Sequence, residues 1–286
     1  MEAPVSKPRP RRRWPWWVRL PLALATAVVL LMGLLLLLQN KMIFFPERGL
    51  PSPAEAGAAF AREVEFTADD GVRLVSWFLP PPEGGPTVVF FHGNAGNLSH
   101  RLDRLLFARE AGWGMLLLGY RGYGKSEGEP GEEGLYRDAR AARGWLLSQP
   151  GVAERRLVFF GESLGCAVAL QLASEAPPAA LILEAPFASL ARMAGHVYPW
   201  LPTAWLLRSR FDNLANARKV RSPALVVHGR RDEVVPFPQG QAVFEALAGP
   251  KRIVPLDCHH NDIPETGGEG YAETLRAFVK EQVPPP

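Results

Sequence analysis

The sequence predicts an α/β fold in which a mostly parallel sheet of about eight strands is covered by helices on both faces. From residue 87 onward, short continuous apolar runs alternate with helix-length amphipathic segments, a pattern typical of parallel strands buried between helices. Ahead of them, two segments of alternating apolar and polar residues flank Asp69-Asp70-Gly71, which predicts a β-hairpin. A long uncharged stretch near the N-terminus adds one further apolar helix.

The elements follow in order along the chain. The hairpin strands are expected at Val64–Phe66 and Val72–Phe78. The core strands are expected at Thr87–Phe91, Met115–Leu118, Leu157–Phe160, Ala180–Leu183, Ala224–Val227 and Arg252–Leu256. The helices are expected at Leu98–Ala111, Glu132–Ser148, Leu164–Ser174, Pro238–Ala248 and Tyr271–Glu281.

Length and charge narrow the class of protein. The chain has 286 residues, of which 47% are hydrophobic and 21% charged, so it is neither disordered nor collagen-like and is long enough for one large domain, expected at residues 46–286. Residues 1–41 hold seven Lys or Arg and one acidic residue, which leaves 25 basic and 28 acidic residues in the body. The body is therefore mildly acidic, and no nucleic-acid partner is expected.

The uncharged stretch is Leu20–Leu38, 19 residues that follow a basic tail at residues 1–19. As a helix it is about 29 Å long, close to the hydrocarbon thickness of a bilayer. The excess of arginine before it predicts a cytoplasmic N-terminus and a domain on the extracytoplasmic side, periplasmic or lumenal. The alternative is a cleaved secretory signal. The bulky residues Gln39–Phe45 favour an uncleaved single-pass anchor, because cleavage requires small residues.

A segment at about residues 187–221 interrupts the alternation of strands and helices. It is too apolar for a solvated linker and too long for an ordinary connection, with Trp200, Trp205 and Phe211 among its aromatic residues. We interpret it as a small lid over the site. The alternative is an extra core helix without a gating role.

The strongest motif is Gly161-Glu162-Ser163-Leu164-Gly165, which lies directly between a predicted strand and a predicted helix. In that context the serine occupies a tight strand-to-helix turn, and the glycines avoid clashes with neighbouring backbone. Its hydroxyl is exposed at the carboxyl end of the strands, where the start of the helix favours developing negative charge. Ser163 is therefore the candidate nucleophile.

A serine nucleophile requires a histidine base and an acid that orients the base. On this architecture both follow the serine, the acid first, on loops after late strands. Asp232 comes after the strand ALVVH and is the candidate acid, with Glu184 as the alternative. His259 and His260 follow the last strand, and their spacing alone does not separate them as the base.

A developing oxyanion is best stabilised by preorganised backbone N–H groups. One is expected from Leu164, the residue after the nucleophile, and the other from Asn94 in the loop after the first core strand. His92 and His228 end strands before glycines and are interpreted as structural.

No metal and no cofactor are expected. Cys258, His259, His260 and Asp262 are near neighbours, and adjacent side chains rarely converge on one ion; Asp262 is interpreted as a local cap or turn residue. Cys166 and Cys258 are too few for a disulfide scaffold and are expected to be buried apolar side chains. The alternative is one bridge between them in an oxidising compartment.

Gly119-Tyr120-Arg121-Gly122-Tyr123-Gly124-Lys125-Ser126 fits the phosphate-binding pattern G-x-x-x-x-G-K-[ST] and follows a strand. A phosphate site needs a helix to begin at once, so that its N-terminus faces the phosphates. Glu127-Gly128-Glu129-Pro130-Gly131 follows instead, adding negative charge and breaking a helix. We therefore interpret the segment as a loop beside the active site.

Five ordered motifs together resemble the membrane-anchored α/β-hydrolase-domain (ABHD) serine hydrolases and their bacterial relatives. They are HGNAGN at residues 92–97, YRGYGKSEG at 120–128, GESLG at 161–165, HGxxD at 228–232 and HND at 260–262. The last motif usually reads Gly-His-Asn-Asp in that family, which matches His260 to the base and puts His259 in the place of the glycine. The resemblance implies the α/β-hydrolase fold and hydrolysis of acyl esters or thioesters, with lipids or lipid-modified proteins among the substrates of some relatives.

The sequence thus predicts a membrane-anchored serine hydrolase that uses Ser163, His260 and Asp232 and forms an acyl-enzyme. The apolar anchor and the aromatic lid predict a hydrophobic acyl substrate. The competing hypothesis is a non-catalytic, membrane-tethered binding module on a hydrolase scaffold, because a fold alone never proves activity.

Overall fold

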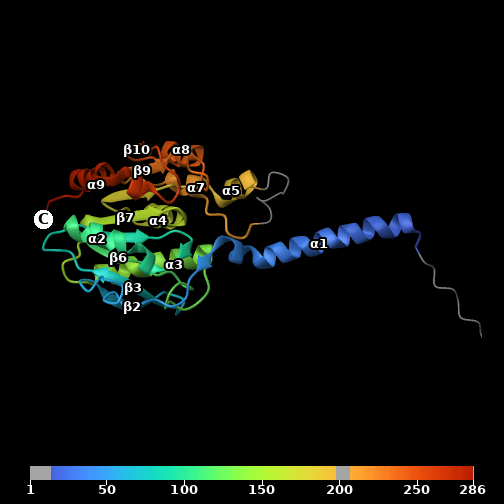
Figure 1. Ribbon diagram of the computed structural model, residues 1–286, viewed down its shortest axis with the longest axis horizontal. Coiled ribbons are helices and arrows are strands. Elements are labelled where there is room, and N and C mark those ends of the chain that lie inside the picture. Colours follow the sequence, from blue (N-terminus) through green and yellow to red (C-terminus); the bar gives the residue numbers. More distant parts are fainter. Residues whose placement is uncertain (1–13, 198–206, 286) are drawn as a thin grey trace, which may run out of the picture. The chain divides into compact units, whose positions relative to one another are not determined.

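The computed structural model describes residues 14–197 and 207–285, which divide between Gln39 and Asn40 into two compact units (Figure 1). The second unit begins six residues ahead of the predicted domain start. Helix α1 (Trp16–Ile43) contains the predicted apolar stretch and extends it at both ends. Its most apolar 18-residue window has a mean hydropathy of 2.6 and no buried residue. At about 42 Å, α1 is long and apolar enough to cross a membrane.

One eight-stranded sheet organises the second unit, in the order β10-β9-β8-β7-β4-β6-β3-β2. Strand β3 pairs antiparallel with β2 and β6, and all other pairs are parallel. The strands are β2 (Arg62–Thr67), β3 (Arg73–Leu79), β4 (Thr87–Phe91), β6 (Gly114–Leu117), β7 (Leu157–Glu162), β8 (Ala180–Glu184), β9 (Ala224–Gly229) and β10 (Lys251–Leu256). The predicted fold class is confirmed, and every predicted strand overlaps an observed one.

Successive strand residues point to opposite sides of the sheet. Because the apolar side chains on both sides are buried, helices cover both faces. On one face, Val89 and Phe159 belong to a core with α3 (Glu132–Leu147), α4 (Leu164–Glu175) and α8 (Phe237–Ala246). On the other face, the strand side chains pack with α2 (Leu102–Glu110) and α9 (Ile263–Gln282). Two short 3₁₀ helices, η1 (Leu98–Arg101) and η2 (Glu154–Arg156), precede α2 and β7.

The last helix departs from its predicted start. Helix α9 begins at Ile263, eight residues before Tyr271, and Gly268 interrupts its helical dihedral angles with a φ of 50°. Glycines at 267, 268 and 270 remove side chains from this stretch, so its hydrophobic pattern gave no helical signal.

The predicted lid segment contains α5 (Leu190–Val197) and α7 (Asn213–Ala217). Phe187 and Phe211, near its two ends, are buried in the core. Residues 198–206, which include Trp200 and Trp205, lie outside the described residues. The gating role of this segment stays a prediction.

A second, two-stranded sheet follows α1 directly. Strand β1 (Phe45–Pro46) pairs in parallel with β5 (Ala95–Gly96), in the loop that the sequence assigns to oxyanion binding. Phe44, just before β1, is 3% exposed and belongs to the main core. The segment after the apolar helix is therefore part of the folded domain, an arrangement that the sequence did not predict.

Candidate active site

Ser163 occupies the turn between β7 and α4 with a φ of 51° and a ψ of −113°. A positive φ is uncommon for a residue with a side chain and marks a strained backbone. The flanking glycines allow the turn. A Cβ on Gly161 would lie 2.6 Å from the Cys166 backbone, and one on Gly165 would lie 1.9 Å from the Phe91 carbonyl oxygen. Close packing of strand, turn and helix thus presents the hydroxyl at the end of the sheet.

The structure brings Ser163, His260 and Asp232 together. His260 Nε2 lies 3.1 Å from Ser163 Oγ, and His260 Nδ1 lies 2.7 Å from Asp232 Oδ2. The carboxylate follows β9 and the imidazole follows β10, so two neighbouring parallel strands deliver both groups to one edge. A continuous hydrogen-bonded chain therefore runs from carboxylate through imidazole to hydroxyl.

The neighbouring candidates face elsewhere. His259 Nδ1 lies 2.8 Å from Glu233 Oε2 at the surface, so this imidazole is paired away from Ser163. Glu184, the alternative acid, binds Arg104 and the Tyr271 hydroxyl instead of His260. The geometry therefore separates the two adjacent histidines, which spacing alone did not do.

His228, interpreted from sequence as structural, contacts the Asp232 carboxylate. Its Nε2 lies 3.3 Å from Asp232 Oδ2 and 2.8 Å from the Val235 carbonyl oxygen. The backbone N–H groups of Val234 and Val235 donate to Asp232 Oδ1. Burial alone would raise the pKa of Asp232, but hydrogen bonds from His228 and His260 outweigh burial and hold that pKa well below 3.8. Asp232 is thus ionised and fixed in orientation. The sequence feature that indicates the contact between His228 and Asp232 is their separation of four residues in the HGxxD motif.

The two predicted oxyanion donors are Leu164, which follows Ser163 directly, and Asn94, which lies in the loop after β4. Leu164 is the first residue of α4, where helical N–H groups have no intrahelical acceptor. The Asn94 side chain donates to the Ile43 carbonyl oxygen at 3.0 Å, and the Asn94 carbonyl accepts from Phe45 N–H and the Tyr123 hydroxyl. The side chain of Asn94 is therefore committed to the scaffold, so the candidate donor of Asn94 is its backbone N–H. The oxyanion roles of Asn94 and Leu164 stay predictions.

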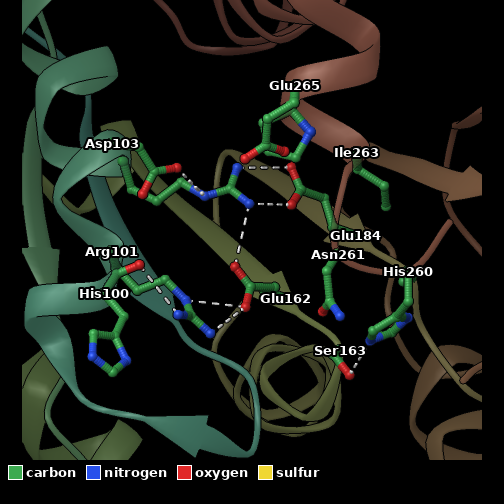
Figure 2. Close-up of a pocket in the computed structure, with 13 residues that line it drawn as sticks. His100, Arg101, Asp103, Glu162, Ser163, Glu184, His260, Asn261, Ile263 and Glu265 are labelled. Atoms are coloured by element: carbon green, nitrogen blue, oxygen red, sulfur yellow. Dashed lines mark hydrogen bonds and ion pairs between the residues drawn. The ribbon is translucent and has the colours of Figure 1, made fainter. Parts of the chain in front are cut away.

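A charged network that the sequence analysis missed lies beside Ser163 (Figure 2). Arg104 contacts Glu184 at 2.6 Å and Glu162 at 3.2 Å, and Arg101 contacts Glu162 at 2.7 Å. Burial would raise the pKa of Glu162, but the charges of Arg101 and Arg104 lower it below 4.5. For Glu184, burial is the largest cause and raises the pKa to about 7, although Arg104 opposes the shift. The only sequence signal was the run of His and Arg residues after the HGNAGN motif.

The segment that fits the phosphate-binding pattern has no free phosphate ligands. The Lys125 ammonium pairs with Glu63 at 2.8 Å. The Ser126 hydroxyl donates to the Gly119 carbonyl at 2.8 Å and accepts from Val75 N–H at 2.9 Å. These groups join the loop to the sheet, in agreement with the interpretation of the segment as a loop.

We expect Lys125→Ala to leave the activity of the site at Ser163 within about twofold of wild type, because it removes one half-exposed ion pair. Steady-state rates and equilibrium dialysis with ATP test this. A large loss of hydrolysis, or ATP binding that the substitution abolishes, would restore the nucleotide-binding hypothesis.

Among residues 14–197 and 207–285, no group of three His, Cys, Asp or Glu side chains is arranged to hold a metal ion. Cys166 and Cys258 are unpaired and buried, as predicted. The Cys166 thiol packs behind the nucleophile turn and contacts the Gly161 and Glu184 carbonyl oxygens.

A parallel sheet covered on both faces, with a serine on the turn between β7 and α4, defines an α/β-hydrolase. The family model described as serine aminopeptidase, S33, matches residues 83–215. An uncharacterized protein of Mycobacterium tuberculosis is 39% identical over 246 residues, covering 85% of this chain and 88% of that protein. The α/β hydrolase domain-containing protein WAV2 of Arabidopsis thaliana is 32% identical over 285 residues, covering 90% and 92%.

Among solved structures, a Pyrococcus furiosus esterase superposes with a TM-score of 0.69 at 21% identity, covering 85% of this chain and 98% of that chain. This likeness concerns the fold. The identity and coverage of the sequence relatives show that the chain belongs to the α/β-hydrolase family, as the five motifs predicted. It is accordingly a hydrolase of esterase-like fold.

Proposed function

We propose that this hydrolase cleaves acyl ester or thioester bonds with Ser163 as nucleophile, His260 as general base and acid, and Asp232 as the orienting carboxylate. The observation that carries the proposal is the hydrogen-bonded chain from Asp232 Oδ2 through His260 to Ser163 Oγ, with distances of 2.7 and 3.1 Å. A serine hydroxyl is a weak nucleophile at neutral pH and becomes reactive when a positioned imidazole accepts its proton.

The reaction proceeds in two steps. Ser163 Oγ attacks the acyl carbon while its proton moves to His260 Nε2, and the backbone N–H groups of Asn94 and Leu164 stabilise the oxyanion. The bond to the leaving group breaks as His260 returns the proton to it. Water then hydrolyses the acyl-enzyme by the same proton transfers in reverse. Asp232, ionised by its hydrogen bonds, keeps the imidazole in the tautomer that accepts at Nε2.

We infer an apolar acyl group and an uncleaved anchor. The aromatic-rich segment at about 187–221 and the exposed apolar surface of α1 support both. Arginines concentrated before α1 support a cytoplasmic N-terminus and an extracytoplasmic catalytic domain. The esterase named among the structural neighbours supports ester chemistry by analogy of fold.

The adjacent histidines provide a matched test. With p-nitrophenyl butyrate as substrate, we expect His260→Gln to lower kcat at least about 10²-fold, because glutamine cannot transfer the proton. His259→Gln alters only a surface pair with Glu233 and is expected to change kcat less than about twofold. Equal losses in both variants would contradict the assignment. A wild-type protein inert to esters would favour the tethered binding module.

A further inference from the structure

A pocket of about 200 Å³ opens beside Ser163 and His260 (Figure 2). Of its thirteen lining residues among the described part of the chain, only Ala185, Ile263 and Pro264 are apolar. This volume lies below the range of about 300–1,000 Å³ for drug-sized ligands. The pocket therefore accommodates a small group of a few heavy atoms.

The charged walls of this pocket disfavour an alkyl occupant. Arg101 and Glu162 form one wall, and Arg104 with Glu184 forms another. An alkyl chain would cover the Arg101–Glu162 pair, whose side chains are 19% and 21% exposed, and would offer it no hydrogen bond, which is unfavourable. A hydroxyl group can instead donate to or accept from the polar groups that line the pocket.

Asn261 supplies an available polar group in the pocket. Figure 2 shows its side chain pointing into the pocket near His260 and Ser163. No hydrogen bond joins its amide to another side chain or backbone group within residues 14–197 and 207–285. A free amide has an NH₂ group that donates and a carbonyl oxygen that accepts. Asn261 can therefore either donate a hydrogen bond to a hydroxyl group or accept one from it.

The position of the pocket indicates which part of the substrate occupies it. On the proposed mechanism, His260 Nε2 donates a proton to the leaving oxygen, which must then lie within hydrogen-bond reach of the imidazole. Both His260 and Ser163 line this pocket, whereas the oxyanion loop residue Asn94 does not. The leaving group therefore extends into the pocket and the oxyanion lies outside it.

We propose that the charged pocket beside His260 is a leaving-group subsite, bounded by Asn261, for esters of small hydroxyl-bearing alcohols. The proposal rests on the Ser163, His260 and Asp232 mechanism. In the acylation step the bond from Ser163 Oγ to the acyl carbon forms and the bond from that carbon to the alcohol oxygen breaks. The serine proton leaves with the alcohol by way of His260, and water later regenerates the free enzyme.

Two esters that differ in one group test the subsite: 2-hydroxyethyl butyrate and propyl butyrate, in which a terminal hydroxyl replaces a methyl. The full-length protein is expected to hydrolyse the hydroxyethyl ester with a kcat/KM about tenfold higher, the effect of one or two net hydrogen bonds. Asn261→Leu, of similar volume, should lower kcat/KM about fivefold for the hydroxyethyl ester and leave the propyl ester within about twofold.

His259→Gln is the matched control, because this residue lies on the same loop but does not line the pocket, and it should preserve the ratio of the two rates. Equal hydrolysis of both esters by the wild type, or an equal loss on both in Asn261→Leu, would overturn the subsite alone. If neither ester is hydrolysed and a fluorophosphonate fails to label Ser163, the hydrolytic mechanism itself is overturned, and the subsite with it.

Discussion

Replacing Ser163 with alanine is expected to lower kcat for ester hydrolysis at least about 10⁴-fold, because no nucleophile remains and only binding and oxyanion stabilisation persist. The fold should survive the change. The hydroxyl bonds only to His260 in the described residues, and Ser163 is partly exposed, so water can replace it. Alanine also tolerates the positive φ of this turn about as well as serine does. The free energy of unfolding should stay within about 1 kcal/mol of wild type.

Ser174→Ala is the control for this change, since Ser174 lies at the other end of the same helix and bonds only to the Gln171 carbonyl. It should retain hydrolysis and fluorophosphonate labelling, whereas Ser163→Ala loses both. Hydrolysis that persists in Ser163→Ala would show that another group attacks the ester. A wild-type protein that is neither active nor labelled would leave the binding module as the better account.

The sheet was predictable because most of its core strands are short apolar runs and the hairpin strands alternate apolar and polar residues, while the helices between the core strands show an amphipathic period. The nucleophile was predictable because its turn requires glycine at two positions where a Cβ would clash with the backbone. These two glycines mark the turn in the GESLG motif. Asp232 and the histidine pair His259 and His260 followed from the order that the architecture imposes, and the resemblance to the hydrolase family matched His260 to the base. All of these signals are local in the chain.

Features formed by distant residues could not be predicted in the same way. Arg104 meets Glu184 across 80 positions of sequence, and nothing in either neighbourhood encodes the pairing. The adjacent histidines also differ through contacts with residues distant in the chain. His259 contacts Glu233, whereas His260 contacts Asp232. The start of α9 was missed because its glycines leave no hydrophobic period to recognise.

The segment after α1 carries the second large expected effect. Phe44 is 3% exposed and packs edge-to-face on Phe211 with ring centroids 6.3 Å apart. The backbone on either side of Phe44 holds the loop of the proposed oxyanion donor: the Ile43 carbonyl accepts from the Asn94 amide, and Phe45 N–H donates to the Asn94 carbonyl. The burial of one aromatic ring thus fixes the strand that positions Asn94.

We expect Phe44→Ala in the full-length chain to lower the free energy of unfolding by about 3–5 kcal/mol, the usual effect of deleting a buried phenylalanine. At a temperature where the variant remains folded, kcat should fall about tenfold to a hundredfold with little change in KM. The proposed role of the Asn94 N–H is to stabilise the oxyanion and not the bound ester, so loosening Asn94 weakens stabilisation of the transition state. Urea denaturation and steady-state kinetics with p-nitrophenyl butyrate measure the two effects.

Phe45→Ala is the matched control, because the neighbouring ring is 52% exposed and the backbone hydrogen bond to Asn94 remains. We expect it to leave both kcat and stability close to wild type. If Phe44→Ala destabilises the fold while kcat stays unchanged, the Tyr123 hydroxyl at 2.7 Å from the Asn94 carbonyl is sufficient to hold the loop, and β1 supports the domain alone. If kcat falls only in Phe44→Ala, the residues that follow the apolar helix position the oxyanion loop, and a protein cleaved after residue 46 would lose activity even though Ser163, His260 and Asp232 all remain.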